Sequence, residues 1–66
     1  MQLLVNGKAV DLPDSSTIAD LLEQLEIPHG RLAVEVNTSI VPRSHHASTV
    51  LKQDDAVEIV HAIGGG

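Results

Sequence analysis

Residues 3–12 read LLVNGKAVDL, and this segment predicts the structure of the first part of the chain. Three aliphatic residues precede Asn6-Gly7, and Val10 and Leu12 continue a two-residue alternation behind it. An Asn-Gly pair between two such runs is the strongest short-range sign of a β-hairpin, because both central residues of a type I′ turn need a positive φ. We therefore expect an antiparallel hairpin at the start of the chain.

A single helix is predicted after this hairpin, from Thr17 to Leu25. Thr17 and Asp20 have the spacing of a capping box, in which side chains satisfy backbone N–H groups at the helix start. Pro28 and Gly30 are expected to end the helix. One hydrophobic stripe at helical spacing consists of Ile18, Leu21, Leu22 and Leu25. Such a stripe needs a sheet to cover it.

Three further strands are predicted behind the helix. Residues 31–37 alternate, with aliphatic side chains on one face, and are the candidate for a central strand. A short strand follows at residues 40–41, and residues 43–52, which lack periodicity, are expected to form a turn of 3₁₀-helix or an irregular loop. The last strand covers residues 55–63. This order predicts an α+β fold in which one helix packs across one face of a mixed sheet.

Length and composition exclude several classes of function. A chain of 66 residues makes one small domain, which buries only about 60% of its unfolded surface, so we expect no enclosed active site. The chain has no cysteine for disulfides or thiol catalysis and no aromatic residue for stacking on nucleic-acid bases. The net charge of −5 repels phosphate backbones and favours a basic protein partner. We expect a cytoplasmic protein that binds neither nucleic acid nor membrane.

The sequence ends on Gly64-Gly65-Gly66, directly after the last predicted strand. Glycine lacks a Cβ, so an extended run of glycines can pass through a channel too narrow for any side chain. Three residues reach about 10 Å, at about 3.3 to 3.6 Å each. We expect a folded domain at residues 1–63 and a flexible tail at residues 64–66, whose terminal carboxylate enters the active site of another protein.

The alternation also predicts an uncovered hydrophobic patch near the tail. Leu4, Val60 and Ala62 lie on the opposite parity to the aliphatic residues that face the helix. One helix cannot cover both faces of a sheet, so these side chains are expected on the open face, where hydrophobic patches often mark docking surfaces. Scattered surface aliphatics without a function are an equally good interpretation of parity alone.

Two groups of side chains have the residue types of active sites without their arrangement. The four histidines lack the spacing of a metal site, and the adjacent His45 and His46 are expected to point in different directions. Ser44, His45 and Ser48, near Asp54, have the residue types of a hydrolytic triad, but so small a chain offers no obvious cleft or oxyanion hole for one. We expect no metal site, and we expect these four residues to be exposed loop residues.

Several segments together resemble the ThiS family. They are the run VEIVHAIGGG at residues 57–66, the turn VNGK at 5–8, the helix at 17–25, and the strands from VEVN at 34–37 to IVPR at 40–43. The resemblance covers essentially the whole chain and implies the ubiquitin-like β-grasp fold. Members often carry Asn-Gly at the position of Asn37-Thr38 and Asp-Gly-Asp at residues 53–55, so two turns of this chain lack the family's glycine.

The resemblance implies a sulfur carrier of thiamine biosynthesis and not an enzyme. An E1-like adenylating enzyme of the ThiF type would use ATP and Mg²⁺ to convert the Gly66 carboxylate to an acyl-adenylate. Sulfur from the persulfide of a cysteine desulfurase, or of another donor, would replace AMP. Thiazole synthase of the ThiG type would consume the resulting thiocarboxylate. The chain itself would bind no cofactor.

Under this resemblance the residues around Gly66 have modest roles. Gly64 and Gly65 would give clearance in the partner's channel. Arg43 would pair with acidic groups of a partner, although an ordinary solvated arginine is the more frequent case. The expected docking residues at the base of the tail are Val60, Ala62 and Ile63.

Three other functions are open to such a domain. One is a related sulfur carrier, the small subunit of molybdopterin synthase, which shares the fold and the glycine pair. Another is a ubiquitin-like modifier that is joined to lysines of target proteins, and the third is an interaction module whose tail is inert. Covalent adducts would identify the modifier, and binding that survives loss of Gly66 would identify the module.

Overall fold

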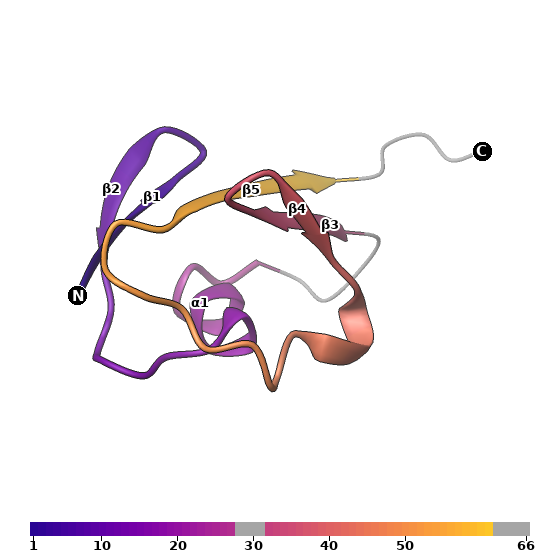
Figure 1. The fold of residues 1–66 in the computed structure, drawn as a ribbon, viewed down its shortest axis with the longest axis horizontal. Coiled ribbons are helices and arrows are strands. Elements are labelled where there is room, and N and C mark those ends of the chain that lie inside the picture. The colour runs from indigo at the N-terminus through magenta and orange to yellow at the C-terminus, as the bar shows by residue number, and fades with distance from the viewer. Residues whose placement is uncertain (28–31, 62–66) are drawn as a thin grey trace.

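The computed structural model of the chain describes residues 1–27 and 32–61 (Figure 1). Its elements are β1 (Gln2–Val5), β2 (Lys8–Asp11), α1 (Ile18–Gln24), β3 (Leu32–Val36), β4 (Ser39–Val41), the 3₁₀-helix η1 (Arg43–His45) and β5 (Ala56–His61). The strands form one sheet in the order β2-β1-β5-β3-β4. β1 and β5 run parallel and the other neighbours antiparallel, which confirms the mixed sheet. α1 lies against one face of the sheet, below it in Figure 1.

Two hairpin turns of the same kind connect β1 to β2 and β3 to β4. Each has two central residues between paired strand ends. These residues are Asn6 (φ 49°) and Gly7 (φ 82°) in the first turn and Asn37 (φ 50°) and Thr38 (φ 72°) in the second. The predicted hairpin at Asn6-Gly7, with a positive φ at both positions, is confirmed. The positive φ of Thr38 is costly, because a β-branched side chain crowds the backbone there.

The asparagine of each turn ties the turn to β5 through its side chain. Asn6 donates from Nδ2 to the carbonyl oxygen of Ile59 (3.2 Å) and accepts at Oδ1 from the Ile59 N–H (2.8 Å). Asn37 accepts at Oδ1 from the Ala56 N–H (2.9 Å) and donates from Nδ2 to the Asp55 carboxylate (2.9 Å). These bonds add to the backbone ladder and hold β5 in position between its neighbours.

β5, the last strand along the chain, occupies the middle of the sheet. The prediction that residues 31–37 form the central strand is therefore wrong in detail, because β3 lies between β5 and β4. β5 pairs with β3 from Val57 to His61, and it pairs with β1 through Ala56 and Val57. The parallel pairing with β1 joins strands from opposite ends of the described chain, so β5 is held from both sides.

The start of α1 is closed by side chains and by a distant loop. Thr17 Oγ1 accepts from the Asp20 N–H (3.2 Å), and the Asp20 carboxylate accepts from the Thr17 N–H (2.9 Å), which confirms the capping box. The N–H groups of the first two helical residues donate to the carbonyl oxygens of Thr49 (3.1 Å) and His46 (3.0 Å). The loop before β5 therefore satisfies backbone donors that the helix cannot satisfy itself.

The end of α1 differs from the prediction. Pro28 and Gly30 do not decide it, because the helix already ends at Gln24. Glu26 adopts φ 55°, and the N–H groups of Glu26 and Ile27 donate to carbonyl oxygens three and five residues earlier (3.0 and 2.9 Å). This pair of bonds is a Schellman motif, which usually has glycine at the position of Glu26.

The segment between β4 and β5 folds back along the start of α1. η1 confirms the predicted 3₁₀ turn within residues 43–52. Thr17 and Val50 form an isolated antiparallel bridge, and the Leu51 N–H donates to the carbonyl oxygen of Ser16 (2.8 Å). These contacts place the Leu51 side chain in the core. In the described part of the chain, neither length nor hydrophobicity equips any helix to cross a membrane.

The hydrophobic core fills the space between α1 and the inner face of the sheet. Its buried members are Leu3, Val5, Leu12, Ile18, Leu21, Leu22, Val34, Leu51, Val57 and Ile59. The helical stripe is confirmed, since Ile18, Leu21 and Leu22 are buried and Leu25 packs partly buried against them. Full burial of one such side chain contributes about 1.5 to 3 kcal/mol, so this face holds most of the stability of the domain.

Candidate docking face and tail

Of the predicted site residues, Val60 and Arg43 lie in the described part of the chain. The others lie outside the described residues, and they are Ala62, Ile63, Gly64, Gly65 and Gly66. The predicted boundary between a domain at residues 1–63 and a tail at residues 64–66 lies there as well, and it stays a prediction. The structure instead establishes how the chain is held up to residue 61.

β5 leads the chain to one end of the sheet while it is held from both sides. β3 pairs with it as far as His61, and on the other side the Asn6 side chain binds the backbone of Ile59. η1 and the C-terminal end of β5 lie at the same end of the molecule (Figure 1). Arg43 is the first residue of η1 and is exposed, and Val60 is the penultimate residue of β5. The two described site residues therefore lie toward one end of the fold.

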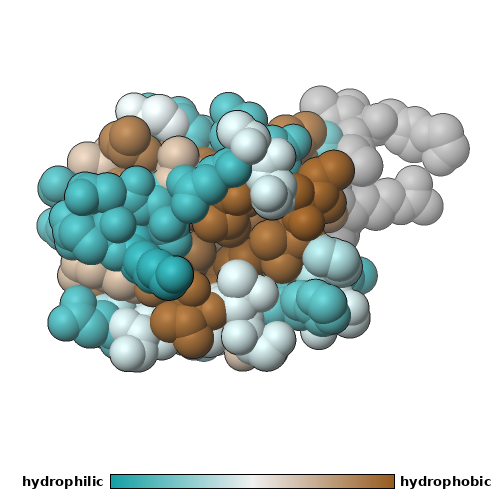
Figure 2. Space-filling view, in the orientation of Figure 1, coloured by the Kyte–Doolittle hydropathy of each residue, from teal (hydrophilic) through white to brown (hydrophobic). Residues whose placement is uncertain are grey.

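The face of the sheet opposite α1, here called the outer face, carries exposed aliphatic side chains. Leu4 is 48% exposed, Val60 56% and Ile40 72%. The prediction that Leu4 and Val60 lie on the open face is confirmed. Ile40 also faces outward, since it pairs with Glu35, but the sequence pattern missed it because residues 40–41 are too few to show an alternation. Figure 2 shows the molecule from the side, so the outer face is seen edge-on at the top. Hydrophobic surface crosses the middle of this view, between the levels of the sheet and α1, and hydrophilic residues gather to its left.

Two glutamates lie directly opposite each other on the outer face. Glu35 of β3 pairs directly with Glu58 of β5, and residues in such positions have Cβ atoms about 4.5 to 5.5 Å apart. Glu35 is half-buried and Glu58 is exposed. The sequence analysis missed this pair, because alternation assigns each glutamate to a face but says nothing about the register between two strands.

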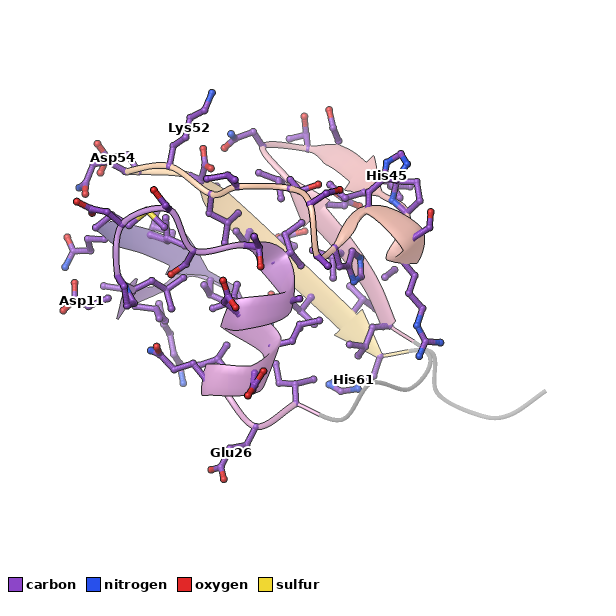
Figure 3. All side chains as sticks on the ribbon, turned by 90° about the horizontal axis from the view of Figure 1, so that it is seen from below. Asp11, Glu26, His45, Lys52, Asp54 and His61 are labelled. Carbon is purple, nitrogen blue, oxygen red and sulfur yellow. The ribbon has the colours of Figure 1, made fainter. Side chains whose placement is uncertain are left out.

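The histidines do not form a metal site in the described part of the chain, where no group of three or more metal-binding side chains occurs. His45 is exposed, whereas His46 is 7% exposed and its Nε2 lies 3.1 Å from the carbonyl oxygen of Val41. The two adjacent rings thus have different surroundings, as predicted. The expectation of exposed loop residues is confirmed for Ser44, His45, Ser48 and Asp54. In Figure 3, His45 and His61 lie on separate sides and do not point toward one another. His29 lies outside the described residues.

The residue types of a hydrolytic triad are not assembled. The Ser48 hydroxyl donates to the backbone carbonyl oxygen of His45 (3.2 Å), and the Asp54 carboxylate accepts from Gln53 (3.2 Å). An open hollow lies beside the start of α1, lined by residues 12–16 and by helix side chains, on the helix side of the molecule. The serine hydroxyl therefore stabilises the loop backbone and is not part of a triad. Compared with this loop and with the hollow beside α1, the outer face is the better candidate for a functional surface.

The sequence profile of the ThiS family matches residues 3–66. The chain belongs to the ThiS family. Among its relatives, the sulfur carrier protein ThiS of Escherichia coli (strain K12) is 33% identical over 66 residues, which cover 100% of both chains. The protein of the same name from Bacillus subtilis (strain 168) is 37% identical over 65 residues, which cover 97% of this chain and 98% of that protein.

A solved structure of the ThiS family supports the fold. The crystal structure of thiamine biosynthesis protein ThiS from Geobacter metallireducens matches with a TM-score of 0.86 and 33% identity, and the match covers 100% of both chains. The ubiquitin-like β-grasp fold is thereby confirmed, with five strands and one helix in the described residues.

Two further relatives are much longer and are named thiazole synthase. The protein from Paramagnetospirillum magneticum is 39% identical to this chain over 66 residues, and the protein from Magnetococcus marinus is 36% identical over 66 residues. This chain spans only 20% of the length of each. In both proteins, a segment similar to this ThiS-family chain is thus part of a longer chain.

Proposed function

We propose that this ThiS-family chain is a sulfur carrier of thiamine biosynthesis and that the Gly66 carboxylate bears the sulfur. The observation that carries the proposal is the match to the E. coli sulfur carrier over the full length of both chains, together with a family match that runs through residue 66. The position of β5 in the middle of the sheet supports the proposal, because the strand that leads toward the glycines is then fixed to the folded domain. The domain can dock on a partner while the three glycines reach about 10 Å further.

The proposed cycle begins with activation of the Gly66 carboxylate by an E1-like adenylating enzyme. A carboxylate oxygen attacks the α-phosphorus of ATP, and pyrophosphate leaves. A free carboxylate is a poor acyl donor, because its charge repels nucleophiles and oxide is a poor leaving group. The mixed anhydride with AMP has neither fault. Mg²⁺ used by that enzyme would offset the charge on the phosphates.

Sulfur then enters from a persulfide, which a cysteine desulfurase or another donor supplies. The outer sulfur attacks the acyl carbon of Gly66 and AMP leaves, so that an acyl disulfide joins Gly66 to the donor cysteine. A thiol attacks the donor sulfur, forms a disulfide with it, and leaves the thiocarboxylate on Gly66. The glycine acyl carbon has no side chain to obstruct these steps, and the chain has no cysteine of its own to carry a persulfide.

The proposed consumer of the thiocarboxylate is thiazole synthase. Its support comes from the two longer relatives of that name, each of which contains a segment similar to this chain. The ThiF-type adenylating enzyme and the persulfide donor are what the resemblance to the ThiS family implies. In this proposal the chain is a substrate of other proteins and binds no cofactor, and its cytoplasmic location stays a prediction.

The proposed docking residues lie at the base of the tail. Val60 is 56% exposed on the outer face and is available to a partner. Ala62 and Ile63 would continue that contact toward the glycines, and Arg43, exposed at the same end of the sheet, would meet acidic groups of the partner. Gly64 and Gly65 would then lie in the narrow channel that leads to the ATP site.

The experiment that tests this proposal measures ATP–pyrophosphate exchange by the adenylating enzyme of the same organism. The Gly66-deleted chain and Gly65→Leu are expected to give no exchange above background, with unfolding temperatures equal to that of the wild type. Lys52→Leu adds the same side chain at an exposed loop position and is expected to be fully active. Normal exchange with the Gly66-deleted chain would refute the proposal.

A further inference from the structure

The turn between β1 and β2 contains a chemically reactive pair of residues. An asparagine followed by glycine loses its side-chain amide in water more readily than other asparagines, because glycine has no side chain to obstruct attack by its own backbone nitrogen. Asn6 and Gly7 are both exposed. In the described part of the chain, nothing beyond the two chain neighbours lies within 4 Å of a Cβ built at Gly7. Water therefore has free access to the pair.

The backbone and the side chain of Asn6 are bonded to β5. The Asn6 N–H donates to the carbonyl oxygen of Val57 (2.9 Å), Nδ2 donates to the carbonyl oxygen of Ile59 (3.2 Å), and Oδ1 accepts from the Ile59 N–H (2.8 Å). Loss of the amide requires the side chain to turn over the Gly7 nitrogen and to release its amino group. The reaction therefore needs both side-chain bonds to break first, because the reacting atoms must be aligned and in contact.

We propose that Asn6 is a site of spontaneous deamidation that β5 keeps closed. The amide is lost only while β5 is separated from the first hairpin turn, and the product prevents the original bonds from forming again. The other reactant is water. The inference is independent of the proposed function, since it concerns the chain alone.

The reaction is balanced without an oxidant or a cofactor. The backbone nitrogen of Gly7 attacks Cγ of Asn6, a C–N bond forms, and the bond from Cγ to Nδ2 breaks. Ammonia leaves and takes up the proton of the Gly7 N–H. The resulting cyclic imide adds one water at either of its two carbonyl carbons. Opening at one carbonyl gives aspartate, and opening at the other gives isoaspartate, in which the main chain runs through the former side chain.

Both products weaken the hold of the turn on β5. The donor to the Ile59 carbonyl oxygen is replaced by a carboxylate oxygen, so two acceptors face each other there. Isoaspartate also adds one CH₂ group to the main chain of a two-residue turn, whose length sets the register of β1 against β2. The change is one-way and acts on the strand that leads toward the glycines.

The second hairpin turn provides an internal control. Its asparagine, Asn37, also bonds to the chain at the start of β5, through the Ala56 N–H and the Asp55 carboxylate. The next residue, however, is Thr38, whose branched side chain obstructs attack by its backbone nitrogen. We expect Asn37 to keep its amide over times that convert Asn6 in the unfolded chain.

The test follows both asparagines in the full chain, folded in buffer and unfolded in guanidinium chloride at the same pH and temperature. Peptide mapping by mass spectrometry measures deamidation, and chromatography separates the aspartate and isoaspartate peptides. Hydrogen exchange measures the protection of the Ile59 amide. We expect folding to slow deamidation of Asn6 about tenfold or more, and by the same factor, within about threefold, as it slows exchange of the Ile59 amide.

Two variants with the same substitution separate the hold on β5 from other effects. Val57→Ala leaves a cavity beneath β5, since Val57 is 1% exposed, whereas Val50→Ala alters a loop side chain that is 51% exposed. Val57→Ala is expected to speed deamidation of Asn6 and exchange of the Ile59 amide by one common factor. Val50→Ala should leave both rates unchanged. If Val57→Ala does not fold, the wild type in denaturant below its unfolding transition gives the same comparison.

Each result decides the inference. Equal deamidation of Asn6 in the folded and unfolded chains overturns the protection by β5, and an unfolded chain that keeps its Asn6 amide overturns the site. Faster exchange of the Ile59 amide in Val57→Ala, with unchanged deamidation, also overturns the inference. The purified isoaspartyl chain is expected to exchange the Ile59 amide about tenfold faster or more than the wild type, and unchanged exchange would overturn the effect on β5.

Discussion

The two faces of the sheet are built from the same strands and differ in almost every physical property. Along β5, Val57 and Ile59 are buried in the core between the sheet and α1, whereas Glu58 and Val60 lie on the open outer face. The inner face is closely packed and aliphatic, and the outer face combines a directly opposed pair of glutamates with exposed hydrophobic side chains. Residues one position apart on a strand therefore lie on faces with different surroundings, and in the proposed docking they would serve folding and recognition separately.

This difference follows from the size of the chain. The described residues include one α-helix, which covers one face of a five-stranded sheet. The opposite face has no α-helix over it within the described residues, and in the proposed function it would be available to other proteins. In the proposed cycle the chain passes from an activating enzyme to a synthase, and a recognition surface that bears little of the stability can meet both without loosening the fold.

The largest effect on the free energy of unfolding is expected from a cavity in the core beside the inner face. Leu21 is 0% exposed between α1 and the sheet, and Leu21→Ala is expected to lower the free energy of unfolding by about 2 to 5 kcal/mol, because it leaves a cavity. Leu4→Ala on the outer face is the matched control, since Leu4 is 48% exposed, and is expected to cost about 1 kcal/mol or less. Urea denaturation measures both. Equal losses would contradict the division between the faces.

A smaller effect on stability is expected from weakening the hold on β5, whose register decides which of its side chains face α1 and which face outward. Asn6→Ala removes two hydrogen bonds to Ile59, and at about 0.5 to 1.5 kcal/mol each the loss is about 1 to 3 kcal/mol. Hydrogen exchange of the Ile59 amide is expected to become faster. Asn6→Asp keeps the acceptor for the Ile59 N–H but replaces the donor with a carboxylate oxygen that faces the Ile59 carbonyl, so we expect a protection between those of the wild type and the alanine variant. An unchanged exchange rate in the alanine variant would show that the side chain does not hold β5.

The third effect concerns the two hairpin turns, which have the same backbone but different residues. The second turn also aligns Ile40 with Glu35 on the outer face. Thr38→Gly removes the strain of φ 72° and is expected to stabilise the domain by about 0.5 to 1 kcal/mol, after the entropy cost of glycine. Gly7→Thr is the reciprocal variant in the first turn. Nothing lies within 4 Å of a Cβ at Gly7, so its cost is that of the backbone alone. A loss of stability on Thr38→Gly would contradict this reasoning, and thermal unfolding measures both variants.

The smallest effect concerns the carboxylate pair itself. Glu58→Gln is expected to raise the free energy of unfolding by about 0.2 to 1 kcal/mol, because it removes the repulsion from Glu35. The gain should shrink in 1 M salt, which screens charges over about 3 Å. Urea titrations at low and high salt measure it, with Glu23→Gln as the exposed control on the helix. A decrease in stability would mean that Glu58 is favourably paired in the free domain.

Features that depend on near neighbours in the chain were predictable. Asn6-Gly7 specified its turn, and Thr17 with Asp20 specified the start of the helix, because the interacting groups are two or three residues apart. Alternation also assigned Leu4 and Val60 to the correct face. The resemblance to the ThiS family supplied the β-grasp topology, which the family match and the solved relative confirm.

Features that depend on long-range pairing were not predictable from the pattern. The middle position of β5 arises from a parallel pairing with β1, and the contact between Glu35 and Glu58 arises from the register of β5 against β3. The turn that ends the helix has a positive φ at Glu26, which is unusual for glutamate and could not be predicted from the residue type. His46 is buried because its loop packs on the start of α1. The roles of residues 62–66 stay predictions.

Whether Gly66 carries sulfur is measured by the intact mass of the protein after incubation with the adenylating enzyme of the same organism, MgATP, a persulfide donor and a thiol. We expect a gain equal to the exchange of one oxygen for sulfur, absent from the Gly66-deleted chain and lost again on addition of thiazole synthase with its other substrates. No adenylate and no sulfur, with an enzyme that is active on its own carrier, would refute the sulfur-carrier proposal and favour an interaction module.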